Sequence, residues 1–296
     1  MGFNLMTTQL LIKSKDFGVD FSEICTIGRQ HLNGSFILFQ NLFNRLGYSS
    51  SEFDQIMTRD SRYSENFFKK LGASTIDSID ASSYENATLI HDMNLPILDN
   101  WKKRYSIVID SGSLEHIFNF PQAIKNCMEM VKPGGHLIGV TPSNNFLGHG
   151  FYQFSPELFY RVFSEENGFR IIKMYLFFSE LNSTVFEVSD PLFVKDRVKL
   201  KNSKESFLFY IAERIEEKPI FTKTPQQSDY EHILWDNSLV NKIGKKGSNY
   251  AKYKKFIPHN IVESLLNVRK NFSHLRLFFN PIGNGNKKYF KKVKLD

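Results

Sequence analysis

The sequence has few cysteines and no long apolar run, and both absences exclude classes of protein. The 296 residues include two cysteines, Cys25 and Cys127, which form no Cys-x-x-Cys pair, so neither a disulfide framework nor a structural zinc site is expected. No stretch approaches the roughly 18 apolar residues of a membrane-spanning helix. Residues 1–12 lack the basic start and apolar core of a signal peptide. These absences predict a cytoplasmic protein without a transmembrane segment.

Basic residues are also scarce relative to acids until the chain nears its end. Residues 241–296 hold 14 Lys and Arg against two acids, a charge of +12, whereas the whole chain carries +7 and residues 1–240 therefore carry −5. Aromatic residues interleave with these lysines. Three interpretations stay open: a solvated appendage, a contact with an anionic surface or polyanion, or a holder for an acidic or lipid-linked substrate. No RNA-binding motif accompanies the lysines, so nucleic acid is not the expected partner.

Strand-like and helix-like segments alternate from Glu23 to Pro142. The apolar spacing predicts strands at 23–27, 74–79, 87–90, 105–109 and 136–141 and helices at 35–46, 64–71 and 120–131. Lys132–Gly135 is expected to be a turn that ends the last of these helices. This alternation needs right-handed crossovers and gives a parallel sheet covered on both faces.

Beyond Pro142 the pattern predicts one more helix and an antiparallel hairpin. The helix is expected at 155–163 with Ser155 as its N-cap, and the hairpin strands at 170–178 and 206–214 should close one edge of the sheet. After Glu217 the composition changes and two prolines mark a linker. We predict an α/β domain at 1–216 and a linker with a basic, helical or irregular segment at 217–296.

The residues that follow the predicted strands are the candidates for ligand binding, because ligands of open parallel sheets bind at the carboxyl ends of the strands. An Asp after the second strand can accept both ribose hydroxyls of a nucleoside. An Asp after the third can accept from an adenine amino group, with a neighbouring Met on the ring. Asp also caps turns, but three in register favour a nucleoside. The candidates are Gly28, Asp80, Asp92, Met93, Asp110 and Ser111.

Two longer motifs resemble those of class I S-adenosylmethionine-dependent methyltransferases. Tyr105–Ile117 (YSIVIDSGSLEHI) is similar to their fourth-strand motif, and Met130–Val140 (MVKPGGHLIGV) to their LKPGG turn and fifth strand. The resemblance covers about residues 23–214. It implies a doubly wound, mostly parallel sheet of seven strands with the last antiparallel, S-adenosylmethionine as cofactor, and methyl transfer as the activity.

The sequence departs from this family at the glycine loop. Where the family has a Gly-x-Gly-x-Gly turn, this chain has Thr26-Ile-Gly28-Arg-Gln-His31, with one glycine. Arg29 and Gln30 either contact the cofactor's methionine carboxylate or the substrate, or are turn residues without a role.

The acceptor side of the predicted site contains two histidines. An oxygen acceptor needs a base for its proton, and His116 and His149 are the candidates. Tyr152 and Gln153, in the loop that also carries His149, could bind acceptor hydroxyls. Glu115-His116 also resembles part of a metal-binding pattern of ubiquinone-biosynthesis O-methyltransferases. Ser111 stands where that pattern has a further acid, so no metal is predicted.

The leading hypothesis is S-adenosylmethionine-dependent methylation of an oxygen in a small molecule or glycan. The alternative is a non-catalytic protein of the same fold that acts as a binding module. A nicotinamide-dependent oxidoreductase is disfavoured because no Gly-x-Gly-x-x-Gly follows the first strand.

Overall fold

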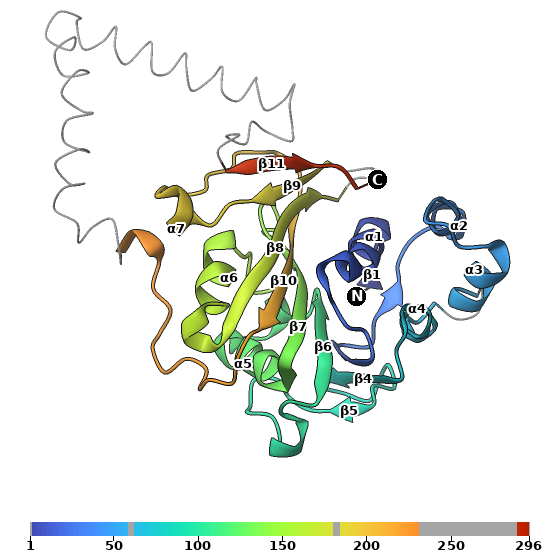
Figure 1. The fold of residues 1–296 in the computed structure, drawn as a ribbon, viewed down its shortest axis with the longest axis horizontal. Helices are drawn as coiled ribbons and strands as arrows, with labels where there is room; N and C mark the ends of the chain where they lie inside the picture. The colour runs from blue at the N-terminus through green and yellow to red at the C-terminus, as the bar shows by residue number, and fades with distance from the viewer. Residues whose placement is uncertain (1, 59–61, 180–183, 231–288, 296) are drawn as a thin grey trace, which may run out of the picture.

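A mixed nine-stranded sheet forms the centre of the molecule in the computed structural model (Figure 1), which describes residues 2–58, 62–179, 184–230 and 289–295. The strand order is β11-β9-β8-β10-β7-β6-β2-β4-β5. The bounds are β2 (Glu23–Ile27), β4 (Thr75–Asp80), β5 (Leu89–Ile90), β6 (Tyr105–Ser111), β7 (Val131–Pro142), β8 (Phe169–Phe178), β9 (Val185–Val188), β10 (Ser206–Arg214) and β11 (Phe290–Val293). Two short strands, β1 (Gly2–Phe3) and β3 (His31–Leu32), pair separately.

The strand directions confirm an α/β sheet in which the strands from β5 to β7 are parallel. Strands β5, β4, β2, β6 and β7 are parallel neighbours. Strand β10 runs antiparallel between β7 and β8. An antiparallel direction was expected for this strand, the last of the seven predicted ones. The expected count of seven was too low, because β9 and β11 extend the sheet beyond β8. The β8–β10 hairpin therefore lies inside the sheet and does not close its edge.

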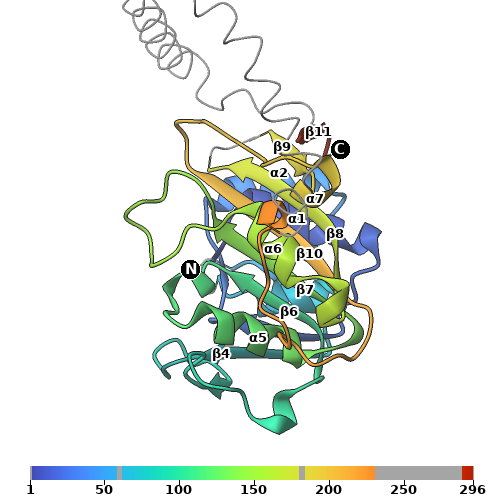
Figure 2. The same ribbon diagram turned by 90° about the vertical axis from the view of Figure 1, so that its left-hand side faces the viewer.

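Helices cover both faces of the sheet. On one face lie α1 (Leu5–Ser14), α2 (Phe36–Arg45), α3 (Ser50–Ile56) and α4 (Glu65–Leu71), and on the other α5 (Phe120–Met130) and α6 (Pro156–Val162). Figure 2 shows α5 and α6 lying in front of the central strands. A short helix, α7 (Pro191–Val194), follows β9. The doubly wound arrangement is therefore present.

Alternation along the strands divides the apolar side chains between two cores. In β10, Leu208 and Tyr210 pack with the α5–α6 side, whereas Phe209 and Ile211 pack with the α1–α4 side. This is the two-residue period of a strand buried on both faces. The same rule explains why β6, with its near-continuous apolar run, is buried at all seven positions.

Lys132–Gly135 follows the end of helix α5, as expected, but it belongs to β7 and is not a separate turn. Helix α5 ends at Met130 and the strand begins at Val131. Tyr105 pairs with Val131 and Ile107 with His136, so residues 132–135 interrupt the ladder opposite Ser106. A Cβ on Gly135 would lie 2.7 Å from the carbonyl oxygen of Ser106, which explains glycine at this close approach.

The C-terminal region is described only in part. Residues 231–288, and with them most of the basic segment 241–296, lie outside the described residues. Strand β11 pairs with β9, and the Gln9 side chain donates to the carbonyl of Leu295 at 2.9 Å. The division at 216/217 stays a prediction. In the part that is described, no helix combines the length and apolar character needed to cross a membrane.

Candidate functional site

The predicted cofactor residues follow neighbouring strands at the carboxyl edge of the sheet. Ile27 pairs with both Ile79 and Asp110, and Asp80 pairs with Ile90. Gly28, Asp80 and Asp110 therefore lie at one edge, as the parallel strand order requires.

Gly28 forms the tight turn directly after β2. Its φ is +71°, in the left-handed region that favours glycine, and its N–H donates to the carbonyl of Ile79 at 2.7 Å. The chain then passes through the buried Gln30, whose amide nitrogen donates to the carbonyl of Ile27 at 2.7 Å. One glycine is thus enough for this turn, because the chain continues into β3 and reaches helix α2 only at Phe36.

Arg29 is held by the polypeptide itself. Its Nε donates to Glu65 at 2.6 Å and an Nη to the carbonyl of Glu85 at 3.0 Å. The guanidinium lies 3.7 Å from the ring centroid of Tyr63. These contacts fix the side chain; its role in substrate binding stays a prediction.

Asp80 and Asp92 each form a local turn. Asp80 accepts from the backbone N–H of Ser82 at 3.2 Å. Exposed Asp92 accepts from the backbone and side-chain nitrogens of Asn94 at 2.9 and 2.7 Å, and these hydrogen bonds lower its pKa. The neighbouring Met93 is buried in the core on the α5–α6 side. Each carboxylate has further acceptor capacity for a nucleoside, and binding there stays a prediction.

Asp110 organises the segment that follows β6. It is fully buried, and its Oδ1 accepts from the N–H groups of Ser113 and Leu114 at 3.1 and 3.3 Å. Burial raises its pKa and these two hydrogen bonds oppose the rise. The bonds hold the 3-10 turn η3 (Leu114–His116), which carries the acceptor-side residues. This placement gives Asp110 a positioning role, whereas contact of Asp110 or Ser111 with a cofactor stays a prediction.

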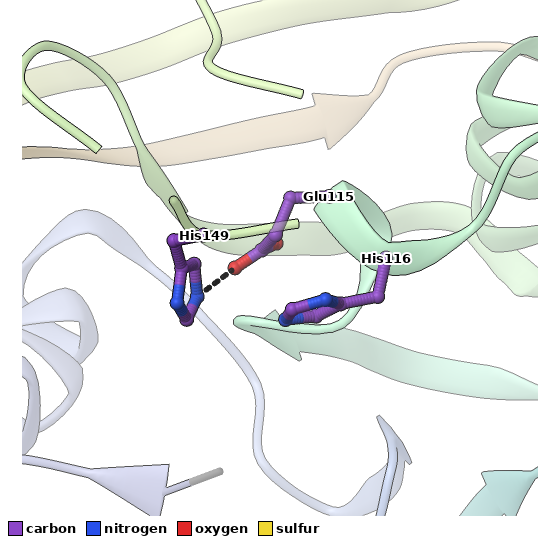
Figure 3. A group of neighbouring side chains, drawn as sticks. All are labelled: Glu115, His116 and His149. Atoms are coloured by element: carbon purple, nitrogen blue, oxygen red, sulfur yellow. Dashed lines mark ion pairs between the residues drawn. The ribbon is translucent and has the colours of Figure 1, made fainter. Parts of the chain in front are cut away.

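Glu115, His116 and His149 form a cluster beside this edge (Figure 3). Their potential ligand atoms all lie within 4.8 Å of one another. The Glu115 carboxylate is 3.5 Å from Nε2 of His149, and the two histidine ring centroids are 4.9 Å apart. Glu115 is 1% exposed, whereas the side chain of His149 is 48% exposed. Both histidines, predicted from sequence, thus face one another across a buried carboxyl group.

Burial and neighbouring charge shift the pKa values in this cluster. Burial raises the pKa of Glu115, and the nearby Asp110 raises it further. Burial lowers the pKa of His116, and His149 lowers it further. His116 is therefore disposed to be neutral and able to accept a proton or bind a cation.

The loop that carries His149 is attached to the backbone of Glu115. The N–H groups of Phe151 and Tyr152 donate to the carbonyl of Glu115 at 2.8 and 3.3 Å. Gly150 has φ +71°, and a Cβ there would lie 2.8 Å from the same carbonyl oxygen. Only glycine fits this contact, so the loop and η3 form one unit.

The two predicted acceptor ligands of this loop make internal hydrogen bonds. The hydroxyl of Tyr152 donates to the carbonyl of Phe118 at 2.6 Å. The side-chain oxygen of Gln153 accepts from the N–H of Phe146 at 2.8 Å. Tyr152 retains acceptor capacity and Gln153 its amide donors, so acceptor binding stays a prediction for both.

Sequence reasoning did not assign a role to Glu115, although it noted the Glu115-His116 pair. It also missed the exposed apolar side chains around the cluster: Phe118, Leu147 and Phe151 are 73%, 92% and 66% exposed. The sequence signal for these exposed side chains is the composition of residues 146–151, in which apolar residues stand beside two glycines that disfavour a helix. The three side chains lie within two residues of His116 or His149 in sequence, and we refer to them as the apolar rim.

Comparison with known proteins finds similar solved structures but no matching family model and no curated relative. The Burkholderia thailandensis 1,6-didemethyltoxoflavin-N1-methyltransferase is 10% identical over 72% of this chain and 79% of its own, with a TM-score of 0.40. A SAM-dependent methyltransferase from Thermotoga maritima is 14% identical over 72% of this chain and 90% of its own, with a TM-score of 0.36. The Thermus thermophilus branched-chain polyamine synthase is 11% identical over 75% of this chain and 60% of its own, with a TM-score of 0.37. At such values, these likenesses do not define the activity of this chain.

Proposed function

We propose that this protein is an S-adenosylmethionine-dependent methyltransferase that methylates an oxygen of a small molecule or glycan. The observation that supports it most is the arrangement at one sheet edge. Gly28 and Asp80 lie at the ends of the adjacent parallel strands β2 and β4. Glu115 and His116 follow the next strand, β6, and His149 comes from the loop after its neighbour β7. A nucleoside-binding side and a proton-accepting side are thereby neighbours.

The chemistry needs little more than position and a base. When bound, S-adenosylmethionine would supply the methyl group: its C–S bond would break as the acceptor oxygen forms a C–O bond, with the electron pair left on sulfur. The hydroxyl proton passes to a ring nitrogen of His149 or His116. The Glu115 carboxyl lies within ion-pair distance of His149, 3.5 Å from its Nε2, and would favour the protonated ring that forms. The apolar rim would exclude water from the reacting atoms.

On the cofactor side, Gly28 would allow close approach of the methionine part and Asp80 would accept the ribose hydroxyls. Asp92 and Met93 would meet the adenine, and Asp110 and Ser111 would support this side from β6. Arg29, Tyr152 and Gln153 would contact the acceptor. A cytoplasmic location fits this soluble cofactor.

The binding-module alternative has its own support. Arg29, Tyr152 and Gln153 have internal partners, and the glycine loop holds one glycine. A protein that had lost catalysis while keeping the fold would show the same features. Cofactor binding separates the two.

The first test is calorimetric titration of the full chain with S-adenosylhomocysteine. We expect micromolar binding, weakened in Asp80→Ala by about 1–3 kcal/mol, the cost of unmatched hydroxyl contacts. Asp54→Ala is the matched control, because Asp54 is an exposed acid on α3, away from the sheet edge. Absence of binding by the folded protein would favour the binding module, and equal affinity of Asp80→Ala would refute the ribose placement.

A further inference from the structure

We propose that Glu115, His116 and His149 bind one divalent transition-metal ion. Two imidazoles and a carboxylate suit Zn²⁺ and its neighbours, whereas Mg²⁺ prefers an all-oxygen set. The sequence argued against a metal because Ser111 replaces an acid. The fold supplies a third ligand from His149, which is distant in sequence but adjacent in space (Figure 3).

The spacing of the ligand atoms is close to that of a metal site. Two ligands at about 2.0–2.1 Å from Zn²⁺ in a tetrahedron lie about 3.4 Å apart. The Glu115 oxygen and Nε2 of His149 are 3.5 Å apart, long for a hydrogen bond between charged groups but matched to a shared ion. All three ligand atoms lie within 4.8 Å, so small side-chain rotations of the exposed histidines would close the set.

The carboxyl group of Glu115 is buried, and one of its oxygens has no partner. Its side chain is 1% exposed, and its Oε2 has no hydrogen-bond partner. Among the described residues no Lys or Arg forms an ion pair with it, and the nearest basic side chain paired with it there is His149. A charge on this buried carboxyl group would be unfavourable without a cation, and a metal ion held with the two histidines would compensate it.

The cluster is held in place and remains accessible. Two backbone hydrogen bonds tie the His149 loop to the carbonyl of Glu115, so the ligands from both segments are positioned before binding. The exposed faces of His116 and His149 leave coordination positions for water or a hydroxyl group, as in sites that act on a ligand.

The metal site does not depend on the proposed function, although it would modify it. An ion would occupy the ring nitrogens that otherwise accept the proton. It would bind the acceptor hydroxyl and lower its pKa, so that the proton leaves to water. Metal binding and cofactor binding can therefore be tested separately on one sample.

The experiment is calorimetric titration of the chelator-treated full chain with ZnCl₂, with MgCl₂ as comparison and the visible absorption of bound Co²⁺ as a second readout. We expect one Zn²⁺ per chain, no competition by Mg²⁺, and an affinity at least tenfold lower in Glu115→Gln and His149→Asn. His91→Asn is the control, because His91 lies outside the cluster and contacts Leu95 and Trp101; it should bind normally.

Equal affinity of all variants, or no Zn²⁺ binding by the folded protein, would overturn the proposal. If one variant fails to fold, loss of the Co²⁺ absorption in His116→Gln gives the same answer. Zn²⁺ binding without S-adenosylhomocysteine binding would support the metal site and refute the methyltransferase; the reverse result would refute only the metal site.

Discussion

Gly139 is a residue at which a single added carbon should destabilise the fold. A Cβ there would lie 2.1 Å from the ring of buried Tyr210. We expect Gly139→Ala to lower the free energy of unfolding by about 1–3 kcal/mol, typical of overpacking, in urea denaturation. The Tyr210 hydroxyl has no partner, so adding Tyr210→Phe should restore part of the loss. A fully stable Gly139→Ala would mean that β10 shifts easily away from β7.

His136 should make stability depend on pH. Burial lowers its pKa in the folded protein, so below about pH 6.5 the unfolded chain binds the proton more readily. Stability is therefore complete above the unfolded pKa and falls as pH decreases toward the folded pKa. We expect His136→Gln to lose less stability than the wild type between pH 7.5 and 5.5 in thermal unfolding. If both proteins lose the same stability over this pH range, the pH dependence comes from groups other than His136.

At the scale of elements, the sequence predicted what local patterns encode. Strands β2 and β10 and the Ser155 cap of α6 matched because apolar spacing and capping chemistry lie within a few residues. Strands β9 and β11 were missed because each has only four residues and because their pairing with each other joins segments that are remote in the chain. The acceptor-side cluster was found in part: both histidines stood out, but their convergence on Glu115 depends on how the loop folds back.

Strand β11 should protect β9. Val185–Val188 pairs with β11 along its whole length but with β8 at only two positions. Removal of residues 289–296 should therefore speed amide hydrogen exchange in β9, because its outer hydrogen bonds are lost. Central β6 in the same sample serves as the control. Unchanged exchange in β9 would show that β11 contributes no protection.

At the scale of the whole molecule, charge is divided between −5 for residues 1–240 and +12 for 241–296. If this basic segment contacts an anionic surface, Lys252, Lys254 and Lys255→Glu should strongly lower the salt concentration that elutes the protein from heparin. The control replaces exposed Lys69, Lys199 and Lys201 by Glu, the same change in net charge. Equal shifts would indicate a response to net charge alone and refute a dedicated contact.

The attachment of the His149 loop to the carbonyl of Glu115 also bears on how such a protein can diversify. The contact uses backbone atoms of Phe151 and Tyr152 together with Gly150, whereas the side chains of Leu147 and Phe151 face solvent. Replacements at these exposed positions would leave the backbone contact intact. In the proposed methyltransferase, the rim is thus a place where evolution, or a combinatorial library, would change acceptor preference without altering the cluster.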